Sequence, residues 1–223
     1  MSEKIRIAIN RGATCDGCDM AILDIDGLLL NLFEIADIAF GPTYMDSKYE
    51  DVEKMPDNYI TATLVHGSMR DEENIHMVKL LRQKSALMIA FGACSSFGGI
   101  PSLANTVKGG MPRIWKTVYD ETASTINPDG FTPQYEWTSP KGNKLTLPKA
   151  ADKVVPMNEI IDVDYYLPGC PPSVDSISTF IKAVYAHVKG CSTSTKVQSS
   201  HQRKLSVMSV QRTKPEKYNI RKL

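Results

Sequence analysis

The sequence predicts an α/β fold in which helices cover both faces of a doubly wound, mostly parallel β-sheet. Strand-like and helix-like segments alternate along the first half of the chain, which is typical of this class. The run Ala86–Phe91 is continuously apolar, as expected of a parallel strand that is buried on both faces. Three of the expected strands lead into loops with glycine and cysteine, and ligand-binding loops follow the carboxyl ends of strands in open α/β sheets.

The first expected strand is Lys4–Asn10, where charged and apolar residues alternate before a wholly apolar run. A leucine-rich segment with helical spacing follows at Ala21–Phe33. The second strand, Ile35–Phe40, ends at Gly41-Pro42, and the third strand is Tyr59–His66. Each strand is thus followed by a turn or helix, as a parallel sheet requires.

A helix is expected after the third strand, because Asp71, Glu72 and Glu73 place negative charge where a helix begins. Apolar residues then recur at helical intervals, and the last turn is basic. The fourth strand, Ala86–Phe91, follows directly.

Regular structure weakens between Lys108 and Lys153, a segment rich in Gly, Pro, Thr and charged residues. We expect long loops there, with a short hairpin at Lys144–Leu147. A strand returns at Ile160–Tyr166, and Ser173 is expected to cap a helix that ends near Gly190. These boundaries predict a domain at 1–190 and a C-terminal extension at 191–223.

The charge is unevenly divided between these two parts of the 223-residue chain. The formal net charge is +1, but the extension from Ser192 onward carries eight Lys or Arg residues against Glu216 alone. A basic extension of this kind indicates a solvated arm or a segment that lies along an acidic partner. Nucleic-acid binding is disfavoured, because no series of stacking aromatic residues accompanies the basic ones.

Several observations indicate a cytoplasmic protein with no direct membrane span. No apolar run reaches the length of a membrane-spanning helix, and the first residues do not form a signal peptide. Five cysteines with one close pair fit reduced thiols or metal ligands better than a disulfide framework.

Four cysteines follow three of the expected strands: Cys15 and Cys18 after the first, Cys94 after the fourth and Cys170 after the last. Because the carboxyl ends of parallel strands meet at one edge of a sheet, we expect the four thiols to converge. Four thiolates can hold a tetrahedral zinc ion or an iron–sulfur cluster. Structural zinc usually draws its ligands from two close pairs of residues, whereas Cys94 and Cys170 stand singly and far along the chain. This spacing favours a cluster over structural zinc. A dithiol redox site and unligated cysteines remain open alternatives.

Glycines lie near every one of these cysteines, and two prolines follow the last. Gly17 separates the first pair, Gly98-Gly99 follow Cys94, and Gly169 precedes Cys170 and Pro171-Pro172. Such residues allow backbone N–H groups to approach sulfur closely and stiffen the loop. Hydrogen bonds to the sulfurs are one of the factors that set the potential of a cluster.

Three motifs in this order resemble the small subunit of nickel–iron hydrogenases, a family related to the 20 kDa subunit of respiratory complex I. They are Cys15-Asp16-Gly17-Cys18, the segment Gly92–Gly99 and the segment Tyr166–Pro172. The resemblance covers Ile5–Gly190. It implies a flavodoxin-like domain that binds one proximal 4Fe–4S cluster through Cys15, Cys18, Cys94 and Cys170. The spaced first pair resembles the hydrogenase branch, because the complex I relatives carry adjacent cysteines. Many periplasmic-type small subunits have a glutamate at the position of Met20, and the segment Cys18–Asp24 is more similar to the soluble cytoplasmic group.

The resemblance also implies a function and two partners. The chain would pass electrons between the nickel–iron site of a hydrogenase large subunit and a further flavin or iron–sulfur subunit, without being the catalyst itself. One alternative is a related complex that reduces quinone or lacks hydrogenase activity. The other is a thiol–disulfide oxidoreductase that uses Cys15 and Cys18. After Gly190 the Cys and His residues are Cys191 and His201 alone, too few to hold a further cluster, so none is expected there.

A few other side chains are weaker candidates. His66 and His76 are either proton carriers or, as is more common, structural and surface histidines. Asp24 and Asp26 either face a partner or cap helices. Cys191 is expected to be a free thiol.

Overall fold

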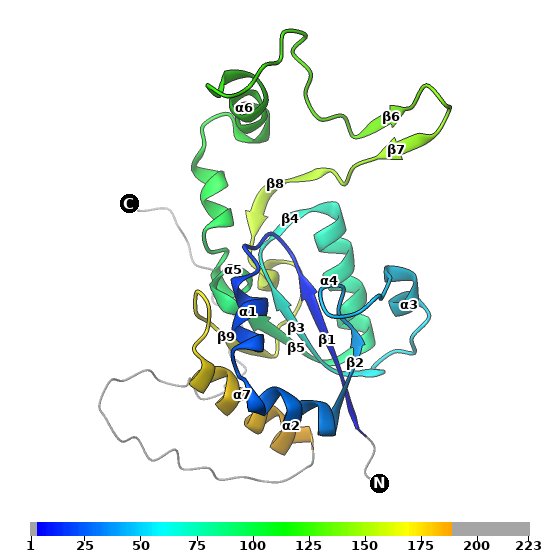
Figure 1. Ribbon diagram of the computed structural model, residues 1–223, viewed down its shortest axis with the longest axis vertical. Coiled ribbons are helices and arrows are strands. Elements are labelled where there is room, and N and C mark those ends of the chain that lie inside the picture. The colour runs from blue at the N-terminus through cyan, green and yellow to red at the C-terminus, as the bar shows by residue number, and fades with distance from the viewer. Residues whose placement is uncertain (1–3, 189–223) are drawn as a thin grey trace, which may run out of the picture.

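The computed structural model describes residues 4–188, and its core is a five-stranded parallel sheet. The strand order is β2-β1-β3-β5-β9, and every neighbouring pair is parallel. This is the flavodoxin-like order, and it confirms the predicted fold class. β2 is added on one side of β1, and β3 and the later strands on the other. The carboxyl ends of β1 and β3 therefore form the switch point of the sheet (Figure 1). The strands are β1 (Ile5–Arg11), β2 (Ala36–Phe40), β3 (Ile60–His66), β5 (Ser85–Phe91) and β9 (Tyr165–Leu167).

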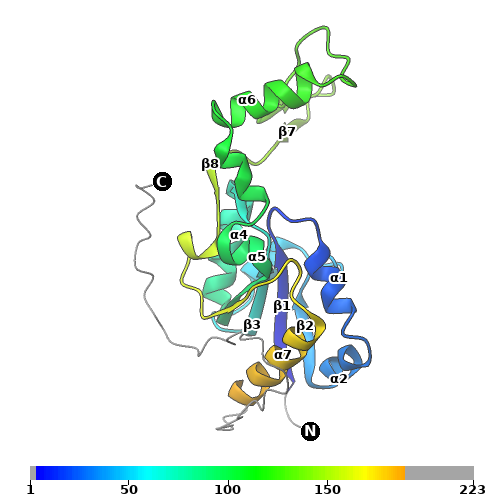
Figure 2. The same ribbon diagram turned by 90° about the vertical axis from the view of Figure 1, so that its left-hand side faces the viewer.

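Helices cover both faces of this sheet (Figures 1 and 2). The alternation of side chains along β1 shows why: Ile7 and Ile9 point to one face, and Ala8 points to the other. The isoleucine face packs against α1 (Gly17–Leu23), α2 (Gly27–Ile35) and α7 (Val174–Val188), whereas the other face packs against α3 (Tyr49–Glu53) and α4 (Glu72–Lys84).

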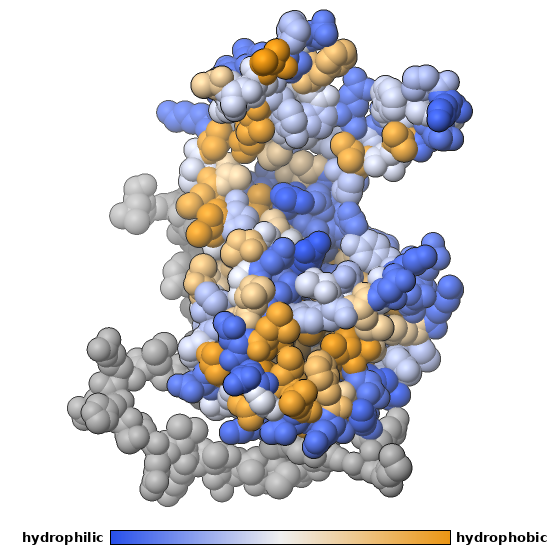
Figure 3. All heavy atoms as spheres, in the orientation of Figure 1, coloured by the Kyte–Doolittle hydropathy of each residue, from blue (hydrophilic) through white to orange (hydrophobic). Residues whose placement is uncertain are grey.

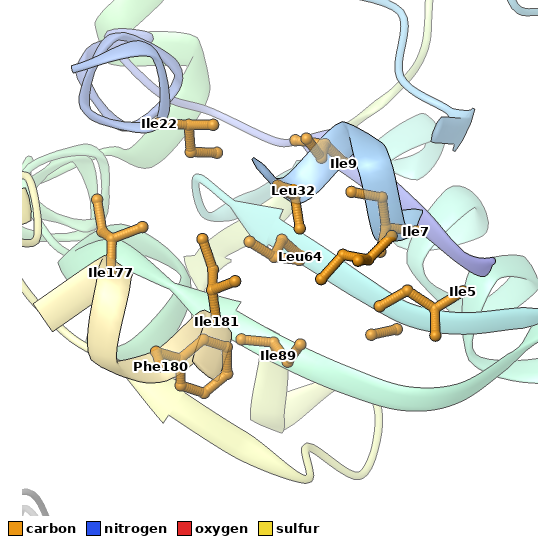
Figure 4. A pocket seen from close by; sticks show the side chains of 12 residues that line it. Ile5, Ile7, Ile9, Ile22, Leu32, Leu64, Ile89, Ile177, Phe180 and Ile181 are labelled. Atoms are coloured by element: carbon orange, nitrogen blue, oxygen red, sulfur yellow. The ribbon is translucent and has the colours of Figure 1, made fainter. Parts of the chain in front are cut away.

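A cavity remains on the isoleucine face, between the sheet, α2 and α7 (Figure 4). The side chains that line it come mainly from these elements, and all of them are apolar: Ile5, Ile7, Ile9, Ile22, Leu32, Ile35, Ala62, Leu64, Ile89, Ile177, Phe180 and Ile181. With no polar group to orient a ligand, we interpret this cavity as part of the packing.

Most of the strand and helix predictions are confirmed to within a few residues, and two are wrong in extent. The predicted helix Ala21–Phe33 is two helices, because Asp26 adopts a positive φ of 55° and interrupts the regular backbone. The predicted strand Ile160–Tyr166 is paired only in its last part. Ile160 and Ile161 pack on the core without joining the sheet, because apolarity reports burial and not strand pairing.

The segment expected to form loops contains regular structure. It includes η1 (Pro101–Thr106), α6 (Gly110–Lys116), η2 (Thr117–Glu121) and β8 (Ala150–Val155), the last paired antiparallel with the unpredicted strand β4 (Met69–Asp71). The hairpin lies near its expected place and is formed by β6 (Glu136–Thr138) and β7 (Lys144–Thr146).

Residues 107–149 form an arm that projects away from the sheet (Figures 1 and 2). Its surface carries apolar side chains (Figure 3), among them Ile126 and Phe131, which are 94% and 69% exposed. Few of these residues are buried, so the general periodicity that marks a core-facing helix or strand is absent from this stretch of sequence.

The C-terminal helix begins as predicted. The Ser173 hydroxyl accepts a hydrogen bond from the Ser176 N–H at 3.3 Å, which is the expected N-cap contact. The expected helix end at Gly190 and the basic extension at 191–223, including Cys191 and His201, lie outside the described residues. Within residues 4–188, none of the helices has the length and hydropathy needed to cross a bilayer.

Candidate metal centre

The four candidate cysteines lie at the carboxyl-end edge of the sheet. Cys15 and Cys18 occupy the turn from β1 into α1, and Cys94 lies in α5 (Gly92–Phe97), a short helix that begins directly after β5. Cys170 lies between β9 and α7. Because β1, β5 and β9 run parallel in the same sheet, the topology delivers the three loops to the same side.

Gly92 is the residue at which the three loops meet. A Cβ atom at this position would lie 2.5 Å from the Cys18 Sγ and 3.6 Å from the Gly169 carbonyl oxygen. The next residue, Ala93, donates its N–H to that same carbonyl at 2.7 Å. The turn with Cys18, the helix with Cys94 and the loop with Cys170 are therefore in contact, and the contact requires glycine.

The Cys94 thiol lies in a backbone cradle. A Cβ atom at Gly99 would lie 2.8 Å from the Cys94 Sγ, and Gly99 has a positive φ of 51°. The Ile100 N–H hydrogen-bonds to the thiol and lowers its pKa, whereas burial has a larger effect and raises it. The Ser68 hydroxyl donates to the Gly98 carbonyl at 2.7 Å and ties the cradle to the end of β3.

The loop before Cys170 is equally constrained. Gly169 has a φ of 148°, and a Cβ there would lie 2.5 Å from the Pro172 Cα. In the first turn, a Cβ at Gly17 would touch the Cys15 Sγ at 3.4 Å. Glycine is thus required by close approach at Gly169 and brings the backbone near sulfur at Gly17.

The thiols interact electrostatically. Burial raises the pKa of Cys18 to about 12, and repulsion from Cys94, Cys15, Asp19 and Cys170 adds to the effect. Cys18 is buried, Cys94 is half-buried, and Cys15 and Cys170 are exposed. Each of the other three thiols thus raises the pKa of Cys18, as expected when the cysteine loops lie at the same edge of the sheet. Gathering four thiolates there needs compensating positive charge, which a metal centre supplies.

Four thiols could hold either a zinc ion or an iron–sulfur cluster. A tetrahedral zinc ion with Zn–S bonds of about 2.3 Å holds its sulfurs about 3.8 Å apart. Among residues 4–188, the group of three metal-ligating side chains whose donor atoms lie within 4.8 Å of one another contains no cysteine. No three of the described thiols therefore have sulfur atoms this close together.

That group consists of Asp16, Asp19 and His66, and its two aspartates belong to the cysteine turn. His66 and Asp19 are 1% and 3% exposed, and His66 Nε2 lies 3.0 Å from Asp19 Oδ1. Burial alone would raise the pKa of Asp19, but His66 and then the Tyr44 hydroxyl outweigh it and hold that pKa below the usual range. The sequence singles out His66 but not its partners, because no spacing rule connects a strand end with a turn that lies 47 residues earlier in the chain.

The remaining candidates are dispersed. His76 is exposed on α4, as the surface interpretation predicts. Asp24 and Asp26 are exposed at the ends of α1 and α2, and the Asp26 side chain makes no cap hydrogen bond. A role for Asp24 or Asp26 toward a partner stays a prediction.

Similarity to known proteins agrees with this geometry. The iron–sulfur subunit of an F420-non-reducing hydrogenase from Archaeoglobus profundus is 42% identical over 172 residues, which are 76% of this chain and 52% of that protein. The delta subunit of the NAD-reducing hydrogenase HoxS from Cupriavidus necator is 28% identical over 78% of this chain and 75% of its own length. The chain thus spans about half the length of several curated relatives that it matches.

A solved structure of the NAD+-reducing [NiFe]-hydrogenase contains a chain with a TM-score of 0.69 and 31% identity, matched over 82% of this chain and 93% of that one. The [NiFeSe]-hydrogenase of Dm. baculatum has a TM-score of 0.53 at 19% identity and shares the fold. The family described as NADH ubiquinone oxidoreductase, 20 Kd subunit, matches residues 15–184, from the first candidate cysteine into α7. The chain therefore belongs to the NADH ubiquinone oxidoreductase 20 kDa subunit family.

Proposed function

We propose that this chain is the electron-transfer small subunit of a nickel–iron hydrogenase complex. It would hold one 4Fe–4S cluster through Cys15, Cys18, Cys94 and Cys170. Electrons would pass one at a time between the nickel–iron site of a large subunit and a further flavin or iron–sulfur subunit. The chain itself would not activate hydrogen, because its converging thiols are all used by the cluster.

The observation that carries this proposal is the contact of three cysteine loops around Gly92. The loops come from β1, β5 and β9, and two close contacts join them: the approach of Gly92 to the Cys18 Sγ and the Ala93 hydrogen bond to Gly169. Cysteines that were only packing residues would not need this crowding. The names of the relatives, an iron–sulfur subunit and a hydrogenase delta subunit, support the same assignment.

The residues around the thiols would prepare the site for electron transfer. A cluster bound there supplies one-electron chemistry. The Ile100 N–H donates to the Cys94 sulfur, and such hydrogen bonds to sulfur raise the potential of a cluster by stabilising its more negative state. Burial at Cys18 would exclude water on one side, while Cys15 and Cys170 are exposed and would face a partner.

A thiol–disulfide oxidoreductase would need only Cys15 and Cys18. It leaves unexplained why Cys94 and Cys170 are brought to the same site by glycines that tolerate no side chain. A complex that reduces quinone would use the same cluster, so it differs in its partners and not in the residues described above.

Iron and acid-labile sulfide in anaerobically purified protein test the proposal, with an expected content of about four of each per chain. Replacing Cys94 by Ser should lose or rearrange the cluster and reduce the charge-transfer absorption of the protein. The same change at Cys191, which lies outside the described residues, is the matched control and should leave iron content unchanged. One zinc per chain without visible absorption, or equal damage from both substitutions, would contradict the ligand set.

A further inference from the structure

Three buried polar atoms without hydrogen-bond partners lie close together, on two residues of the cysteine turn and at the end of β3. They are Oδ1 of Asp16, Oδ2 of Asp19 and Nε2 of His66. Within the described residues only two other buried side-chain atoms lack a partner, Ser95 Oγ and Asn158 Oδ1, and neither belongs to this group. A buried polar atom without a partner is costly, so three at one place indicate that something else binds there.

The remaining polar atoms of the same side chains are held by neighbours. Arg11 Nη1 lies 3.2 Å from Asp16 Oδ2, and the Tyr44 hydroxyl donates to Asp19 Oδ1 at 2.7 Å. His66 Nδ1 lies 3.4 Å from Thr14 Oγ1. In each side chain one polar atom is held by a neighbour and the other is left without a partner. Hydrogen bonds from surrounding residues orient metal ligands in the same way.

We propose that Asp16, Asp19 and His66 bind a divalent transition-metal cation. Their donor atoms lie within 4.8 Å of one another, close enough to share one ion. Two carboxylate oxygens and one imidazole nitrogen suit zinc, manganese or ferrous iron, with water completing the coordination. None of the three ligands is a cysteine, so the site uses donor atoms other than the four thiols.

An ion pair between His66 and Asp19 is the simpler interpretation, and it accounts for only part of the geometry. Nε2 and Oδ1 are 3.0 Å apart, and this contact with His66 lowers the pKa of Asp19, although its geometry is poor for a hydrogen bond from the ring. The pair also leaves Oδ2 of Asp19 and Oδ1 of Asp16 without partners. A cation bound by the group would supply the partner that these carboxylates lack.

The position of the site gives it a structural role. Asp16 and Asp19 belong to the turn that carries Cys15 and Cys18, and His66 is the last residue of β3. A shared ion would fasten the cysteine turn to the neighbouring strand. It would also place positive charge behind a site where thiols converge.

Mn2+ is a suitable probe, because it prefers carboxylate and imidazole ligands to thiolates and its free ion has a strong EPR signal. The full chain, purified anaerobically with its cluster and washed with chelator, should bind about one Mn2+ per chain. His66→Gln and Asp19→Asn should each weaken binding by at least about tenfold, since changes to residues that only support the ligands already cost that much in metal sites. Asp24→Asn on the same segment and His76→Gln on α4 are the matched controls and should bind as the parent does.

Asp16→Asn provides an independent variant, because Asp16 is only half-buried and its replacement leaves the core untouched. It should also weaken binding, and added Mn2+ should raise the melting temperature of the parent chain but not of the three ligand variants. Failure of the parent to bind Mn2+, or binding that survives His66→Gln unchanged, would overturn the proposal and leave an ion pair. A parent chain that bound Mn2+ but contained no iron or acid-labile sulfide would instead count against the cluster.

Discussion

At the scale of single residues, the glycines of the cysteine loops show how little room the site leaves. Gly92 combines a positive φ of 83° with a Cβ position 2.5 Å from the Cys18 Sγ. Gly142, in the β6–β7 hairpin, has nearly the same φ of 81° but nothing within 4 Å. Comparing substitutions at the two positions therefore separates the effect of backbone strain from the effect of crowding the thiol.

Replacing Gly92 by Ala should prevent normal cluster assembly, because the new methyl group occupies the place of the Cys18 sulfur. Gly142→Ala should cost only the left-handed strain, about 1–2 kcal/mol, and retain full iron content. Iron per chain and the visible absorption of the two variants, purified side by side, measure the difference. Equal iron in both would show that the loop can move away from Cys18 at little cost.

At the scale of elements, α4 shows a cap that the sequence pattern predicts and the structure contains. The Asp71 carboxylate accepts a hydrogen bond from the Asn74 N–H at 2.8 Å, and Glu72 and Glu73 add negative charge to the first turn. This helix covers the sheet face opposite α1, α2 and α7, through Met77, Val78 and Leu81. The cap thus fixes where a core helix begins.

Asp71→Ala should lower the free energy of unfolding by about 1 kcal/mol, since an N-cap acceptor is lost. For a chain of this size the melting temperature should fall by about 2–4 °C. Asp71→Asn keeps an acceptor oxygen and should recover most of the loss. The Arg70 side chain lies 3.1 Å from the Asp71 carboxylate and is 57% exposed, so the loss of this ion pair in both variants should matter little. If Asn were as damaging as Ala, the ion pair and not the cap would be the stabilising contact.

At the scale of the whole molecule, the cysteine edge of the sheet is bordered by exposed apolar side chains. Phe97, Ile100 and Leu103, on α5 and at the start of η1, are 68%, 70% and 60% exposed. They follow Cys94 directly in the chain, and hydrophobic residues are visible along this side of the molecule (Figure 3). An apolar border of this kind is typical of a protein interface.

Leu103→Glu should therefore prevent copurification of a large subunit while leaving the iron content of this chain intact, because a charge would be buried at the interface. Leu145→Glu is the matched control: Leu145 is 53% exposed, but it lies in the hairpin of the arm. Affinity purification of the complex followed by metal analysis of each subunit measures both effects. If only the Leu145 variant lost the partner, the docking surface would be the arm.

The sequence by itself was sufficient for the order of strands and helices around the sheet. Continuous apolar runs such as Ala86–Phe91, acidic helix starts such as Asp71 and glycine-marked strand ends are local signals, and each depends on only a few neighbouring residues. The resemblance of the three cysteine motifs pointed to the same family for the same reason, because each motif is a short continuous stretch.

Only the tertiary structure decided which residues meet. The crowding of Gly92 against Cys18 joins segments 74 residues apart in the chain. The group of Asp16, Asp19 and His66 joins a turn to the end of a strand across the switch point of the sheet. In the arm the hairpin was predicted but α6 and η2 were missed, because most of their residues are exposed and exposed helices have no apolar stripe to reveal them. Local sequence patterns indicate which residues are buried. A site depends instead on which strand ends become neighbours, and the order of strands in the sheet decides that.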